Sequence, residues 1–188
     1  MKSMTKRLLA ALLAVAALFA LAGCSKSDKA GAAPKDYTKI LHDARPDEDN
    51  EYYMIFSPGE DGKFTAQYGY SDSYDAAQLD EEIRNMLLPL LNLEEDMYTD
   101  FAASVSGMMV QSYGIAIVKP AEGKQQAVSE ALDAYVQSQM QSMEHYLEDQ
   151  YQIAASSHIS TAPTGEVILV CCETPEAVMN AIKTALAA

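Results

Sequence analysis

The sequence predicts an α+β fold, in which a mixed or antiparallel sheet of about four strands carries helices packed on it. Apolar side chains alternate over residues 101–106 and 113–118, which predicts two neighbouring strands. An amphipathic pattern over residues 124–150 predicts the longest helix. Six successive apolar residues, 167–172, predict a strand buried on both faces and central in the sheet. The predicted order is strand, strand, helix, strand, strand, helix.

The first predicted element of the domain is a short helix from residue 37 to about 45. Asp36 is a suitable N-cap, and apolar residues recur on one side of this segment. Pro46 ends the helix, because proline cannot continue the hydrogen-bond ladder. Residues 47–51 are nearly all acidic and are expected to form a loop.

A hairpin and a second helix are predicted before residue 101. Residues 52–56 alternate as in a short strand, and residues 63–68 fit a return strand after a turn rich in Pro and Gly. Leucine, isoleucine and methionine then recur at helical spacing over residues 76–88. Pro89 is expected to end or kink that helix near Leu88.

The last predicted elements follow the long helix. Residues 158–161 fit a strand, and a turn at 163–165 separates it from the apolar run already described. Thr174 is a suitable cap for a final helix, since Pro175 is favoured at the first helical position.

The composition excludes several classes of protein. The 188 residues include 13 basic and 27 acidic side chains, for a formal net charge of -14. Nucleic acid is therefore not an expected partner, because phosphate binding needs a basic patch. Three cysteines are too few for a disulfide scaffold. No phosphate-binding glycine loop, dinucleotide fingerprint or hydrolase triad is present, so no cofactor and no catalytic residue is predicted.

The beginning of the chain has the layout of a secretory signal. Three basic residues precede an apolar run over residues 8–21, and Leu21-Ala22-Gly23-Cys24 is similar to the bacterial lipobox. The run is short for the roughly 30 Å hydrocarbon core, so a permanent membrane helix is the weaker interpretation. We expect residues 1–23 to be a lipoprotein signal peptide and Cys24 to carry a diacylglyceryl group. The alternative is an ordinary secretory signal with a chance cysteine.

The lipid would anchor the domain through a tether. A diacylglyceryl group supplies two acyl chains, which give stable anchoring where one chain does not. We predict that residues 24–35 form a flexible tether and that residues 36–188 form a single α+β domain. The acidic domain is repelled by an anionic membrane surface and is expected to stand off the bilayer.

Three stretches of the chain resemble one family. They are Asp43-Ala44-Arg45 with Glu51-Tyr52, the run from Tyr113 to Ala121, and the run from Tyr146 to Ala154. The sequence is similar to the domain-of-unknown-function 4358 family over most of residues 43–186. Its members are mostly predicted lipoproteins of Gram-positive, clostridia-like bacteria. The resemblance implies an anchor on the outer face of a single membrane, and it brings no activity or site residue.

Asp47, Asp49 and Glu51 have the alternating oxygens with which a calcium loop begins. An EF-hand needs glycine at position six and glutamate at position twelve. Those positions hold Tyr52 and Pro58, so the motif fails and a solvated acidic loop is expected. A weak calcium site of another kind stays open, but no metal ligand is predicted.

The remaining candidates for chemistry are a histidine pair and two cysteines. His145 and Glu148 lie three residues apart on the predicted long helix, but the other histidines are far away in sequence, so a surface pair is expected. Cys171 and Cys172 are adjacent in a predicted strand and point to opposite faces. We expect two buried thiols that pack as hydrophobic groups.

The eleven tyrosines are expected to include half-buried side chains at core edges, with a binding surface as the alternative. Those near predicted loops or edges are Tyr52, Tyr53, Tyr68, Tyr70, Tyr74 and Tyr98. The predicted function is a membrane-anchored extracytoplasmic lipoprotein that is not an enzyme and binds an envelope protein or a wall polymer. The alternative is a small-ligand or cation-binding lipoprotein that assists transport.

Overall fold

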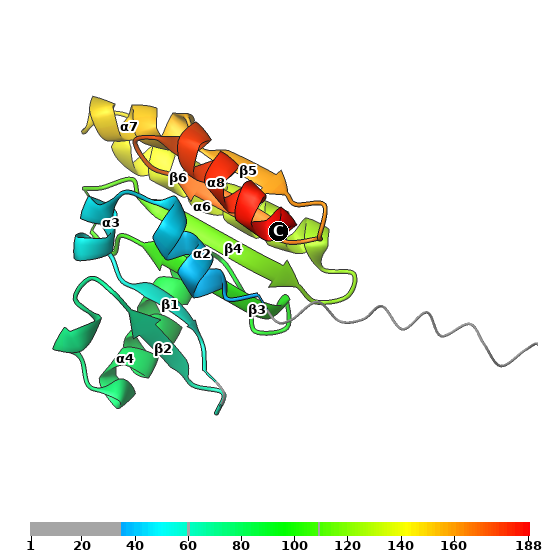
Figure 1. Cartoon of the computed structure of the whole chain (residues 1–188). Helices are drawn as coiled ribbons and strands as arrows, with labels where there is room; N and C mark the ends of the chain where they lie inside the picture. The colour runs from blue at the N-terminus through cyan, green and yellow to red at the C-terminus, as the bar shows by residue number, and fades with distance from the viewer. Residues whose placement is uncertain (1–34, 60, 109) are drawn as a thin grey trace, which may run out of the picture. The chain divides into compact units, whose positions relative to one another are not determined.

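A six-stranded antiparallel sheet lies at the centre of the computed structural model, which describes residues 35–59, 61–108 and 110–188 (Figure 1). Its strands lie in the order β2-β1-β3-β4-β6-β5, and every neighbouring pair is antiparallel. Asp36–Ala188 forms one compact unit. The strand bounds are β1 Ile55–Pro58, β2 Phe64–Gln67, β3 Tyr98–Val105, β4 Gly114–Pro120, β5 His158–Thr161 and β6 Val167–Cys171.

The predicted α+β class is confirmed, and the sheet is antiparallel rather than mixed. The prediction of about four strands is too low, because a short hairpin, β1 and β2, extends the sheet at its edge. Each of these strands has four residues, and β1 meets β3 at one register pair, Phe56 opposite Ala103. The sequence predicted both strands, at 52–56 and 63–68, but did not count them in the sheet of about four strands.

Helices cover both faces of the sheet. α2 (Tyr37–Ala44) and α8 (Pro175–Ala187) pack on one face, whereas α4 (Ala76–Glu82) and α6 (Gln125–Met143) pack on the other. The remaining helical segments are α3 Asp47–Tyr52, the 3₁₀ turn η1 Ser71–Ser73, the π-helical turn η2 Ile83–Leu87, α5 Leu88–Leu90 and α7 Glu148–Ala155. Within the described residues, every helix is too short or too polar to span a membrane.

The alternation of side chains in the central strands explains the two cores. In β4, Ile115 and Ile117 pack toward α2 and α8, whereas Ala116 and Val118 pack toward α4 and α6. All five residues of β6 are buried, and β6 lies between β4 and β5. The predicted strand with two buried faces is therefore confirmed.

Two predicted elements differ in the structure. The acidic segment predicted as a loop is the helix α3, and three carboxylates occupy its first turn, where free backbone N–H groups favour negative charge. The predicted helix 124–150 breaks after Met143, whose carbonyl oxygen accepts from the N–H groups of Tyr146 and Leu147 at 2.9 and 3.0 Å. Tyr146 is 75% exposed, so it does not continue the buried stripe. The break turns α7 back against α6.

Candidate functional site

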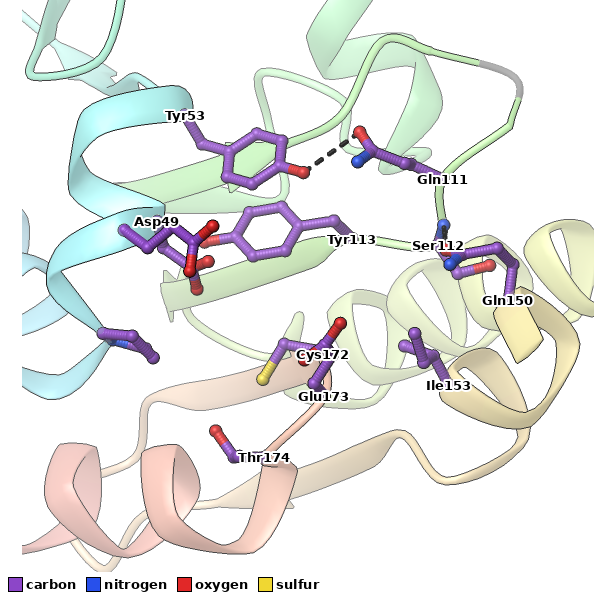
Figure 2. A pocket seen from close by; sticks show the side chains of 12 residues that line it. Asp49, Tyr53, Gln111, Ser112, Tyr113, Gln150, Ile153, Cys172, Glu173 and Thr174 are labelled. Atoms are coloured by element: carbon purple, nitrogen blue, oxygen red, sulfur yellow. Dashed lines mark hydrogen bonds between the residues drawn. The ribbon is translucent and has the colours of Figure 1, made fainter.

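A cavity of about 150 Å³ lies where β4 begins and β6 ends (Figure 2). We call it the sheet-end cavity. Its walls come from α3 with the residues on either side of it, the segment before β4, α7, and the segment after β6. The lining residues are Pro46, Glu48, Asp49, Tyr53, Gln111, Ser112, Tyr113, Gln150, Ile153, Cys172, Glu173 and Thr174.

Arg45 holds the elements behind the cavity together. It follows α2 directly and is only 5% exposed. Its Nη1 donates to Ser104 Oγ at 2.7 Å and to Tyr113 Oη at 3.2 Å. Its Nη2 donates to the Tyr53 carbonyl oxygen and its Nε to Asn50 Oδ1, both at 2.6 Å. All of these acceptors are neutral, and the four hydrogen bonds join α2 and α3 to the sheet.

Two stacked tyrosines form one wall of the cavity. The rings of Tyr53 and Tyr113 are nearly parallel, with centroids 3.9 Å apart, and Figure 2 shows one above the other. Tyr53 Oη donates to Gln111 Oε1 at 3.0 Å. The backbone of Gly69 lies against Tyr53, and a Cβ there would be 2.6 Å from the Tyr53 carbonyl carbon. Gly69 also has φ +52, so glycine is required at this close approach.

Tyr113 is fixed from behind by the long helix α6. Tyr135 Oη donates to the Tyr113 carbonyl oxygen at 2.8 Å. The ring of Tyr135 lies on Gly114, where a Cβ would be 2.6 Å from Tyr135 Oη. Burial raises the pKa of Tyr113 well above the usual tyrosine range. Tyr113 is therefore a neutral hydroxyl at physiological pH.

The charged groups that face the cavity are carboxylates. Burial raises the pKa of Asp49, and the negative charges of Glu173 and Glu48 raise it further. A hydrogen bond from Tyr113 and the positive charge of Arg45 act in the opposite direction. In the described part of the chain, no Lys, Arg or His nitrogen lies within 4.0 Å of the carboxylate oxygens of Glu48, Asp49 or Glu173.

A buried hydroxyl in the cavity wall has no hydrogen-bond partner. Ser112 is 2% exposed, and its Oγ is the one buried side-chain oxygen or nitrogen without a partner among the described residues. The Ser112 backbone N–H is satisfied, because it donates to Gln150 Oε1 at 2.9 Å. Gln150 reaches this position because the break after Met143 directs α7 toward the segment before β4.

A shallower groove continues from the cavity over the surface. It has a volume of about 330 Å³ and shares Glu48, Asp49, Tyr53, Gln111 and Glu173 with the cavity. Exposed apolar side chains border it and the hollow beside it. They are Tyr52, Tyr70, Tyr74 and Met108.

Residues 71–172, more than half of the chain, match the family described as Domain of unknown function (DUF4358). The chain belongs to the DUF4358 family. No curated protein and no solved structure matches it. The matched segment of this DUF4358 protein supplies Gln111, Ser112 and Gln150 to the cavity, whereas Asp49 precedes it.

The DUF4358 structure separates most of the candidate residues that the sequence indicated. Asp49 faces the cavity, whereas Asp47 and Glu51 are exposed on α3. His145 lies in the break between α6 and α7, 3.9 Å from Glu144, while Glu148 accepts a hydrogen bond from Gln152. Within the described ranges, no group of three or more His, Cys, Asp or Glu side chains is placed to hold a metal ion.

The two cysteines are buried on opposite faces of the sheet, as their adjacent positions predicted. Cys171 belongs to the core under α6, and Cys172 to the core under α8. Burial raises the pKa of Cys172 to about 11, so its thiol is protonated and unreactive at neutral pH. Sequence reasoning missed that Cys172 also lines the cavity. Cys24, the predicted signal over 1–23 and the tether up to residue 34 lie outside the described residues.

Some of the tyrosines pack at edges of the core, and others lie at the cavity or the groove. Tyr53 lines the cavity, and Tyr52 and Tyr70 border the groove. Tyr68 packs against the His42 ring, and Tyr98 packs edge-on against Phe101. Sequence reasoning missed Arg45, Ser112 and Gln150 as members of the site. Arg45 and Gln150 stand in stretches that carry the family resemblance, which was the available signal.

Proposed function

We propose that this DUF4358 protein is a membrane-anchored extracytoplasmic lipoprotein whose domain binds a protein of the cell envelope and catalyses no reaction. The observation that carries the proposal is the groove bordered by Tyr52, Tyr70 and Met108. Tyrosine and methionine are enriched in protein interfaces relative to the rest of a protein surface. The net charge of -14 disfavours a polyanionic wall polymer and favours a partner with a basic surface.

Small-ligand binding is the second candidate, and the sheet-end cavity favours it. Polar groups from α3, α7 and the segment before β4 converge there, as they do in ligand sites. Five residues line both the cavity and the groove, so a protein partner that reaches into the cavity uses both.

The anchor is tested by the variant Cys24→Ser in cells that secrete the full chain. We expect the variant to move from the membrane fraction to the medium, because a serine oxygen does not accept the thioether-linked lipid. Ser25→Ala keeps the cysteine sulfur and is the matched control, which should stay with the membrane. If Cys24→Ser remains in the membrane pellet after carbonate washing, lipid anchoring at Cys24 is wrong.

Partner binding is tested by a photo-crosslinking amino acid placed at Tyr70 of the full chain in intact cells. We expect one discrete crosslinked protein, because Tyr70 is 46% exposed at the groove. The same amino acid at Glu122 is the control, since Glu122 is exposed at the opposite end of β4. Equal adducts from both positions, or none from Tyr70, would contradict a specific partner at the groove.

A further inference from the structure

The cavity contains a polar group that the fold does not satisfy. A buried hydroxyl without a hydrogen bond is unfavourable, and Ser112 Oγ is the one such side-chain atom among the described residues. Its side chain is among those that line the cavity (Figure 2). Such an atom is accounted for when a ligand atom completes its hydrogen bonds.

The charged residues around the cavity indicate which charge that ligand carries. Glu48, Asp49 and Glu173 face it without an ion pair within the described ranges. Arg45 is close by, but it is buried behind the wall and its donors are taken by four neutral acceptors. A ligand therefore meets carboxylates and hydroxyls, which are acceptors for a cationic donor.

Size and shape favour a small organic cation. A cavity of about 150 Å³ is large enough for a six-carbon ring. Tyr53 and Tyr113 both line the cavity and stack on each other, so one wall is aromatic. A metal ion is the weaker candidate, since the described residues contain no cluster of three or more ligating side chains.

We infer that the sheet-end cavity binds an ammonium group carried on an aliphatic chain, with Ser112 Oγ and the carboxylates of Asp49 and Glu173 as its acceptors. The inference rests on the proposed function and deepens it, because a lysine side chain of the envelope partner carries this group. A free small amine carries it too. An ammonium group has three donors, which matches the three acceptors named here.

The experiment is calorimetric titration of the purified full chain in detergent with two probes. The probes are Nα-acetyl-lysine amide and n-butylammonium chloride, and Nα-acetyl-norleucine amide is the control that has the aliphatic chain without nitrogen. We expect both ammonium probes to bind in the millimolar range and the norleucine control not to bind. Tighter binding of the lysine probe indicates a partner's side chain, and equal binding indicates a free amine.

Single substitutions then locate the binding. Asp49→Asn and Ser112→Ala should each weaken n-butylammonium binding about 10-fold, the effect of one hydrogen bond to a charged group. Asp47→Asn lies two residues away on the same helix but faces solvent, and it should leave the affinity unchanged. Circular dichroism and the melting temperature establish that each variant is folded.

The inference is overturned if the norleucine control binds as well as the lysine probe, if neither ammonium probe binds, or if both folded variants bind like the natural chain. A discrete crosslink from Tyr70 combined with any of these results leaves partner binding at the groove intact. The failure of the ammonium site is thereby distinguishable from the failure of the proposed function.

Discussion

The two ends of α2 are both joined to the sheet by a buried charged side chain, but the two junctions differ in one respect. At the start of α2, Tyr37 Oη donates to Glu166 Oε1 at 3.0 Å, and Thr164 Oγ1 donates to the other carboxylate oxygen. At the end of α2, Arg45 donates to neutral acceptors on α3 and the sheet. The Arg45 end adjoins the cavity and the unpartnered hydroxyl of Ser112.

This difference separates a structural network from a binding site. A buried charge costs free energy unless hydrogen bonds satisfy it, and both Glu166 and Arg45 have such bonds. The Glu166 network is complete with side chains of the chain itself. Among the described residues beside Arg45, the fold leaves the Ser112 hydroxyl without a hydrogen bond and the carboxylates of Glu48, Asp49 and Glu173 without an ion pair, which is the arrangement of a site that awaits a cationic ligand.

The largest expected effect is the loss of Arg45. Arg45→Ala removes four hydrogen bonds and leaves buried acceptors such as Ser104 Oγ without their charged donor. We expect a loss of about 3 kcal/mol in the free energy of unfolding. The melting temperature should fall by about 6–12 °C, measured by circular dichroism.

Two further variants sharpen this comparison. Tyr37→Phe removes one of the donors to Glu166 and should cost about 1–2 kcal/mol, without changing the affinity for n-butylammonium. Arg84→Ala is the control of the same residue type, because Arg84 is partly exposed, pairs with Asp80 and Glu95 and lies over the Phe64 ring, and its loss should cost less than the loss of Arg45. If Arg45→Ala lowers the free energy of unfolding by no more than Arg84→Ala does, Arg45 does not join the end of α2 to the sheet in the way that Glu166 joins its start.

The sequence predicted the central strands because their patterns are long. β3 and β4 carry alternating apolar residues and β6 a continuous apolar run, each over at least five residues, so their burial is visible in the sequence. The hairpin strands predicted at 52–56 and 63–68 are present as β1 and β2 with slightly shifted bounds, whereas the helix α3 was missed, since it is short and is held by the hydrogen bond from Arg45 to Asn50. Acidic composition alone indicated a loop where the first turn of α3 favours negative charge.

The site was less predictable than the fold, for a physical reason. Asp49 attracted attention only through a calcium motif that fails, and Ser112 is an ordinary serine between two predicted strands. Its importance lies in an unmade hydrogen bond, which is a property of the packed structure and not of local sequence. Gln150 joins the site only because the predicted long helix breaks after Met143.

The smallest expected effect is a pH-dependent one at Asp49. Burial raises the pKa of Asp49 in the folded state, so folding favours its protonated form. The ionised carboxylate therefore destabilises the fold at neutral pH, and the fold gains stability as the pH falls through the raised pKa. Asp49→Asn should raise the melting temperature by about 1–2 °C at pH 7, which corresponds to about 0.5 kcal/mol.

The direction of the change in melting temperature distinguishes Asp49 from Asp47, which lies on the same helix. The advantage of Asp49→Asn should shrink on acidification, because the natural side chain becomes neutral as well. Asp47→Asn removes an exposed carboxylate from the first turn of α3 and should not stabilise the protein. A lower melting temperature for Asp49→Asn at pH 7 would show that Asp49 is satisfied within the fold, and the Arg45 end would then be as complete as the Glu166 end.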